Sequence, residues 1–137
     1  MDLIYAAKDG DIQHVRALLD RGTDPNIIDN DGDTALMLAS NRGYTDIAEL
    51  LLVFGADPNI QANNGFTSLI IASVKNHIDI VELLLENDAD PNIQSNRGTT
   101  PLIGASQLGN IDIVRLLLEH NADPNIIDND GDTSLIK

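Results

Sequence analysis

Side chains capable of acid–base chemistry are numerous in this chain, but they recur instead of gathering at one place. Asp46, Asp79 and Asp112 lie 33 residues apart, where a carboxylate in the first turn of a helix would favour the helix dipole. The histidines occupy unrelated positions in that register, and we interpret them as solvated surface residues: His14, His77 and His120. Because catalysis needs a unique constellation in a pocket, we predict no enzyme, no catalytic residue and no cofactor.

A carboxylate-rich pentapeptide could bind a cation. The run Asp-Asn-Asp-Gly-Asp stands at residues 29–33 and again at residues 128–132. A calcium loop of the EF-hand type has its glycine sixth and a glutamate twelfth. Here the glycine is fourth, and Ser40 occupies the twelfth place counted from Asp29. The pattern favours at most weak, incidental cation binding, so we predict no dedicated metal site.

Composition and charge exclude several classes of function. The chain has 137 residues, with 22 acidic and 8 basic side chains and a net charge of −14. Such a surface repels phosphate backbones and anionic lipids, so neither nucleic acid nor a membrane is an expected partner. The absence of cysteine excludes disulfides, thiolate nucleophiles and cysteine-based metal sites. No apolar run approaches the ~18 residues of a membrane span, and no basic segment precedes the apolar N-terminus. We therefore expect an intracellular, cytoplasmic protein, and a nuclear location is also compatible with the sequence.

A 33-residue period organises the whole chain. Asp-Pro-Asn begins at residues 24, 57, 90 and 123, and a threonine followed two residues later by leucine keeps the same phase. Such a period is typical of stacked repeats, in which each unit relies on its neighbours for a core. The pattern predicts a single domain, 1–137, with repeats at approximately 1–33, 34–66, 67–99 and 100–132 and a partial fifth repeat at 133–137.

Each period is expected to form two short helices and an extended turn. Thr100 followed by Pro101 is typical of a helix start, because a hydroxyl caps the first turn and proline needs no N–H partner there. Residues that accept a positive φ should close the helices. They are Gly10, Gly43, Asn76 and Gly109 for the first helices, and Gly22, Gly55, Asp88 and Asn121 for the second.

These features resemble the ankyrin repeat. Thr-Pro-Leu-Ile-Gly-Ala at residues 100–105 is similar to the Thr-Pro-Leu-His-x-Ala signature of that family, and residues 109–118 and 121–125 match as well. The resemblance implies an all-α fold, an ankyrin-repeat solenoid of stacked helix-turn-helix units with projecting β-turn or hairpin loops. The histidine of the signature is replaced by Met37, Ile70 and Ile103, so we expect apolar packing at these positions.

The resemblance also implies non-catalytic binding of a protein or peptide on a concave face made of turn tips and first helices. Phe66 is the residue that we single out, because the fold demands no aromatic there. Its counterparts are Asp33, Thr99 and Asp132. It is a candidate hot spot, and the alternative is that it packs on a neighbouring tip. A partner with a small apolar centre and basic flanks would be complementary, since acidic tips flank two nearly neutral ones. The candidate partner-binding residues are Asp31, Asp33, Asn41, Arg42, Asn64, Phe66, Val74, Lys75, Arg97, Thr99, Gln107 and Leu108.

Other interpretations stay open. Residues 24–34 recur identically at 123–133, which favours either recent duplication or construction from a shared template. The chain could therefore be a structural fragment, or an engineered, idealised array with no partner of its own. At the C-terminal end we expect apolar residues to be only partly covered, so the protein is either a monomer or a weak homo-oligomer that associates through that end. These residues are Leu116, Leu117, Leu135 and Ile136.

Overall fold

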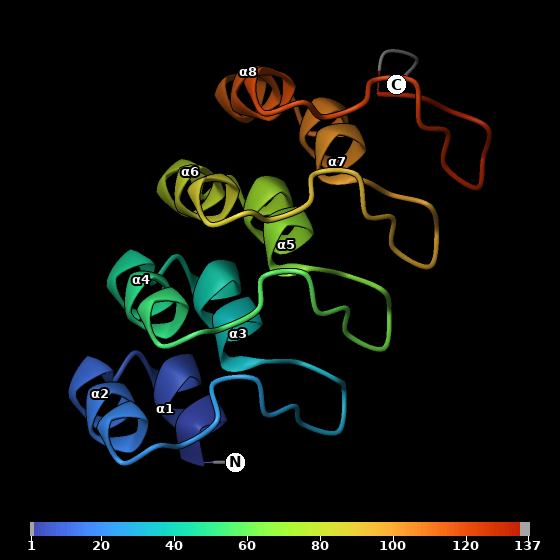
Figure 1. Cartoon of the computed structure of the whole chain (residues 1–137). Coiled ribbons are helices and arrows are strands. Elements are labelled where there is room, and N and C mark those ends of the chain that lie inside the picture. The colour runs from blue at the N-terminus through green and yellow to red at the C-terminus, as the bar shows by residue number, and fades with distance from the viewer. Residues whose placement is uncertain (1, 135–137) are drawn as a thin grey trace.

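The computed structural model describes residues 2–134, and within them it forms eight helices and no strand. The helices are α1 (Asp2–Asp9), α2 (Ile12–Asp20), α3 (Ala35–Arg42), α4 (Thr45–Val53), α5 (Ser68–Val74), α6 (Ile78–Glu86), α7 (Pro101–Gln107) and α8 (Ile111–Glu119). They form pairs that stack in chain order, as Figure 1 shows. The first helices of successive pairs pack on one another, α1 on α3, α3 on α5 and α5 on α7. The predicted all-α solenoid is confirmed.

Loops project from the stack on the side of the first helices (Figure 1). In the described part of the chain these loops contain turns rather than strands, so each predicted hairpin is a tight tip closed by two backbone hydrogen bonds. In the second tip the Ala62 N–H donates to Phe66 O at 2.9 Å, and the Gly65 N–H donates to Ala62 O at 2.8 Å. The same two bonds recur in the other tips, so equivalent side chains stand at equivalent places along the stack.

A threonine caps the start of three first helices, as predicted. The side chains of Thr34, Thr67 and Thr100 each accept a hydrogen bond from the backbone N–H three residues later, at 3.1–3.2 Å. The residues expected to close the helices all have positive φ, from 62° at Asn76 to 94° at Gly55. Loss of one threonine cap costs about 1 kcal/mol, so each repeat fixes its helix boundaries locally.

The core lies within each helix pair and between neighbouring pairs. The alanines in the middle of the first helices are fully buried: Ala39, Ala72 and Ala105. Their small side chains let α3, α5 and α7 approach closely. Met37, Ile70 and Ile103 are buried as well, so apolar packing replaces the signature histidine, as we expected. Burial of each large apolar side chain contributes about 1.5–3 kcal/mol. No helix among the described residues is both long and apolar enough to cross a membrane.

Asparagine side chains link each repeat to the next. Asn59 Oδ1 accepts a hydrogen bond from the Asp90 N–H at 2.8 Å, and Asn59 Nδ2 donates to Asp88 O at 3.4 Å. Asn26 and Asn92 occupy the equivalent positions, and each accepts a 2.8 Å bond from the following repeat. The asparagine of each Asp-Pro-Asn triplet is therefore a connector between repeats as well as part of a turn.

Two histidines are less freely solvated than we expected. His77 is half-buried, and its Nε2 lies 3.0 Å from Asn41 O in the preceding repeat. Because the partner atom is a carbonyl oxygen, the ring nitrogen donates. His120 Nδ1 lies 2.9 Å from Leu116 O within its own repeat. His14 is exposed, as predicted.

The last helix pair is more closely packed than expected. Leu117 is fully buried, which corrects the expectation that it would be only partly covered. The reason is its register, since Leu117 stands where Leu84 faces the core one repeat earlier. Leu116 is half-buried, as expected. Leu135 and Ile136 lie outside the described residues.

Candidate protein-interaction groove

The loop tips form a hydrogen-bonded row along one side of the stack. The Asn63 N–H donates to Asp31 O at 2.9 Å, and Asn63 Nδ2 donates to Asn30 O at 3.0 Å, both across to the preceding tip. Asn96 and Asn129 repeat this pair of bonds at the next two tips. The row is thus held in one arrangement by the protein itself, which reduces the ordering cost of binding a partner.

A hollow of about 260 Å³ lies between the tips and the first helices α3 and α5. Phe66 is half-buried rather than exposed, and its backbone is fixed because the Phe66 N–H donates to Asn64 Oδ1 at 3.0 Å. We call this the Phe66 hollow. All of its lining residues except Ile71 are among the predicted binding residues. The lining comprises Asp33, Asn41, Asn64, Phe66, Ile71, Val74 and Lys75.

A second hollow, of about 280 Å³, lies one repeat earlier, and we call it the Tyr5 hollow. Asp33 lines both hollows, so together they form a continuous surface that we call the inner groove. Tyr5, which is 58% exposed, was not predicted. The sequence contained a signal that could have found it, because Tyr5 occupies the same repeat position as Leu38 and Ile71, which also line these hollows. The lining comprises Ile4, Tyr5, Lys8, Asp29, Asn30, Asp31, Asp33 and Leu38.

Three carboxylates crowd the first tip, at the N-terminal end of the inner groove. Asp29, Asp31 and Asp33 each offer a carboxylate oxygen, and these oxygens lie within 4.8 Å of one another. Burial raises the pKa of the Asp33 carboxyl, and the negative charges of Asp29 and Asp31 raise it further. Among the described residues no hydrogen bond or ion pair reaches the Asp33 carboxylate. The ion pair that these residues do form joins Arg115 to Asp112 on α8, at 3.9 Å.

The same carboxylate cluster has a structural role in the tip. Asp29 Oδ1 accepts hydrogen bonds from the N–H groups of Asp31 and Asp33, at 2.9 Å each. These bonds close the turn in the way that aspartate side chains commonly do. The loop geometry therefore explains the spacing of the carboxylates without an ion, and the absence of a dedicated metal site stays a prediction.

Val74 connects the Phe66 hollow to the next repeat. A Cβ on Gly104 would lie 2.9 Å from Val74 Cγ2 and 3.7 Å from Thr99 Cγ2. The missing side chain at Gly104 thus makes room for Val74. Leu108 is exposed and lines neither hollow, so it does not extend the same cavity. The predicted residues that lie outside both hollows are Arg42, Arg97, Thr99, Gln107 and Leu108.

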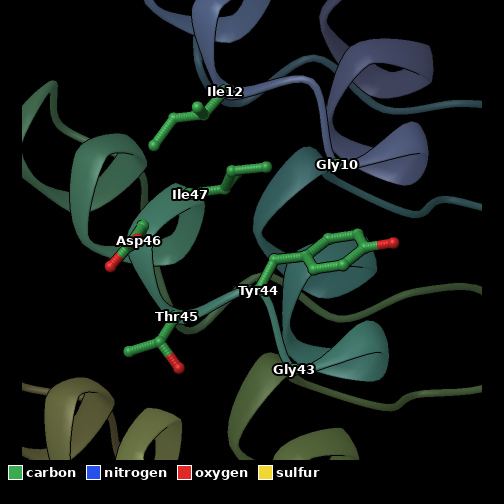
Figure 2. A pocket seen from close by; sticks show the side chains of 7 residues that line it. All are labelled: Gly10, Ile12, Gly43, Tyr44, Thr45, Asp46 and Ile47. Carbon is green, nitrogen blue, oxygen red and sulfur yellow. The ribbon is translucent and has the colours of Figure 1, made fainter.

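A larger hollow, of about 360 Å³, lies near the turns that join α1 to α2 and α3 to α4. Figure 2 shows Ile12 and Ile47 on one side of it and the Tyr44 ring beneath Gly10 on the other. A Cβ on Gly10 would lie 3.0 Å from Tyr44 Cζ, so the ring packs against the preceding repeat. Its charged lining residue is Asp46. We interpret this hollow as a packing seam between repeats.

Comparison with known proteins bears on the whole chain. The family described as "Ankyrin repeats (3 copies)" matches residues 3–95 and 87–137. The chain belongs to the ankyrin repeat family. Ankyrin repeats generally mediate protein–protein interaction, and proteins of this family are generally non-catalytic scaffolds.

Individual relatives share shorter stretches with the chain. Ankyrin repeat domain-containing protein 46 of Rattus norvegicus is 49% identical over 49 residues, which are 36% of this chain and 22% of that protein. A putative ankyrin repeat protein of Rickettsia felis is 48% identical over 48 residues, 35% of this chain and 76% of that protein. Serine/threonine-protein kinase 12 of Arabidopsis thaliana is 45% identical over 49 residues, 36% of this chain and 11% of the kinase. The chain thus matches only a small part of the rat protein and of the kinase.

Proposed function

We propose that this ankyrin repeat protein is a non-catalytic scaffold that binds a protein or peptide through the inner groove. The observation that carries the proposal is the Phe66 hollow, which gathers six of the twelve predicted binding residues in one cavity. Its key positions vary between repeats: the place of Phe66 is taken by Asp33 in one neighbouring repeat and Thr99 in the other. Central buried positions, by contrast, keep the same residue from repeat to repeat, as Leu36, Leu69 and Leu102 do.

Phe66 has the properties of an interface anchor. A half-buried aromatic ring with a fixed backbone loses little conformational freedom on binding, and such residues dominate the energetics of many interfaces. Around it the apolar lining of Ile71 and Val74 favours an apolar group of the partner. The carboxylates of the first tip favour a basic flank, and the net charge of −14 would accelerate encounter with a basic partner at low salt.

The proposal is tested by affinity capture from cell lysate with three immobilised proteins: wild type, Phe66→Ala and His14→Ala. His14 is exposed on α2 and lines neither hollow of the inner groove, so it is the matched control. We expect a protein that is retained by wild type and His14→Ala at low and moderate salt, and lost with Phe66→Ala. Equal retention by all three, or equal loss from both variants, would contradict the proposal. Retention that disappears with salt for every variant would indicate only nonspecific attraction to an acidic surface.

A second candidate function is weak self-association through the C-terminal pair of helices. Leu118 is 47% exposed, whereas its counterpart Leu85 is 8% exposed beneath the following pair. Ile111 on the same helix is 68% exposed. Light scattering over a range of concentrations tests this candidate, because a mass that stays monomeric at every concentration would refute it.

A further inference from the structure

We infer that the inner groove binds an extended peptide segment by two different anchors, a basic side chain at the Tyr5 hollow and an apolar side chain in the Phe66 hollow, about three residues apart. The inference rests on the binding function proposed above and specifies the chemistry of the partner. It also places the basic anchor at the end of the groove that lies toward the N-terminal repeats.

The first anchor follows from unbalanced charge at the Tyr5 hollow. Three of its lining residues are carboxylates and Lys8 supplies one positive charge, so the hollow is strongly negative. The Asp33 carboxylate has no hydrogen-bond donor or cation as a partner among the described residues. Burial raises its pKa, and the negative charges of Asp29 and Asp31, which raise the pKa further, would be balanced by a cation. The exposed ring of Tyr5 adds a face on which a guanidinium group can stack. Arginine is therefore preferred to lysine, because it can pair with a carboxylate and stack at the same time.

The second anchor follows from the lining of the Phe66 hollow. Phe66, Ile71 and Val74 supply apolar atoms there, and Asn41 and Asn64 supply polar groups that can bond a peptide backbone. Lys75 also lines this hollow, so a second basic side chain would be repelled there. A leucine-sized or aromatic side chain is the expected occupant, since it would remove these apolar surfaces from water.

The distance between the anchors follows from the stack. Asp33 lines both hollows, and the hollows lie one repeat apart on helices that pack directly, because α3 contacts both α1 and α5. Packed helices are about 8–10 Å apart, and an extended chain rises about 3.3 Å per residue. About three residues of extended peptide therefore span the distance from one hollow to the next.

The first stage of the test is a selection of random twelve-residue peptides, displayed on phage, against the immobilised wild-type chain. We expect the selected peptides to share a basic residue and an apolar residue separated by two others. Selected peptides without a basic residue, or with an acidic one in its place, would overturn the inference. Failure to select any peptide whose binding depends on Phe66 would overturn the inference alone, because the proposed function also covers a folded protein and is decided by the capture experiment with Phe66→Ala.

The second stage measures the affinity of one selected peptide, fluorescently labelled, by anisotropy. The double variant Asp31→Asn/Asp33→Asn should weaken binding about tenfold or more, the loss typical of a charge-assisted contact. The chain supplies a matched control, because Asp130→Asn/Asp132→Asn removes the same charges from an identical pentapeptide outside the inner groove. That control should weaken binding less than about twofold, since its effect is limited to screened, long-range charge.

Double-mutant cycles assign each anchor to its hollow. The effect of Asp33→Asn should depend on whether the peptide carries its basic residue, and the effect of Phe66→Ala on whether it carries its apolar residue. Equal losses from both aspartate double variants would show that only overall charge matters, which overturns the first anchor. In that case a large loss with Phe66→Ala would leave the proposed function standing, so the two failures are distinguishable.

Discussion

The asparagine links between repeats give a prediction whose magnitude can be worked out from the structure. In Asn59→Ala the 2.8 Å bond from the Asp90 N–H and the 3.4 Å bond to Asp88 O are both lost. A typical hydrogen bond contributes about 0.5–1.5 kcal/mol net. The second bond is long, and water can reach the groups set free, so the total should be about 1–2 kcal/mol. For a chain of this size that corresponds to a decrease in Tm of about 3–8 °C.

The assay is equilibrium unfolding in urea followed by circular dichroism, with Asn125→Ala as the control. Asn125 occupies the same place in the last repeat, where no described residue bonds to its side chain. Its replacement should therefore change the free energy of unfolding by less than about 0.5 kcal/mol, as for an ordinary surface position. If the two variants lose the same stability, the asparagines stabilise their own turns and the reasoning about links between repeats is wrong.

Three further predictions concern single positions. His77→Ala should lower the free energy of unfolding by about 1 kcal/mol, because the 3.0 Å bond to Asn41 O is lost; thermal unfolding of His77→Asn, which can still donate, should show partial rescue. Gly104→Ala should lower the free energy of unfolding by about 1–2 kcal/mol and weaken peptide binding, because its Cβ would lie 2.9 Å from Val74 Cγ2 and overpacking of this buried position outweighs the helix-propensity gain; urea unfolding that shows a more stable variant would contradict this. Asp33→Asn should stabilise the protein at pH 7, because a raised carboxyl pKa means that the ionised form opposes folding. Chemical unfolding at several pH values should show that this gain disappears as the pH falls below the ordinary value of 3.8.

The fold could be predicted almost entirely from the sequence, because its determinants are local and repeated four times. Each threonine cap is a hydroxyl bonded within three residues, and each helix end is a residue that accepts positive φ. The solenoid follows from these signals and from the 33-residue register. Leu117 shows where the sequence argument failed. We expected it to be partly covered because it lies in the last helix, but its position within the repeat points it into the core, where it is fully buried.

The candidate site was predicted less completely, because it depends on contacts between repeats. The variable positions could be read from the sequence, and six of them converge on the Phe66 hollow. Tyr5 was missed because none of the predicted binding residues was taken from the first helix of the first repeat. The half-buried state of Phe66 and the link from His77 to Asn41 depend on the spacing of neighbouring helices. No local pattern in the sequence encodes that spacing.

The most direct test of the binding face is a chemical-shift map. The ¹⁵N-labelled chain is titrated with a peptide selected against it, and the shifted backbone amides are assigned. The account predicts that the largest shifts lie on the first and second tips and on the inner sides of α1, α3 and α5, around Asp33 and Phe66. Shifts concentrated around Tyr44, in the packing seam between repeats, or on α8, with these tips unchanged, would contradict it.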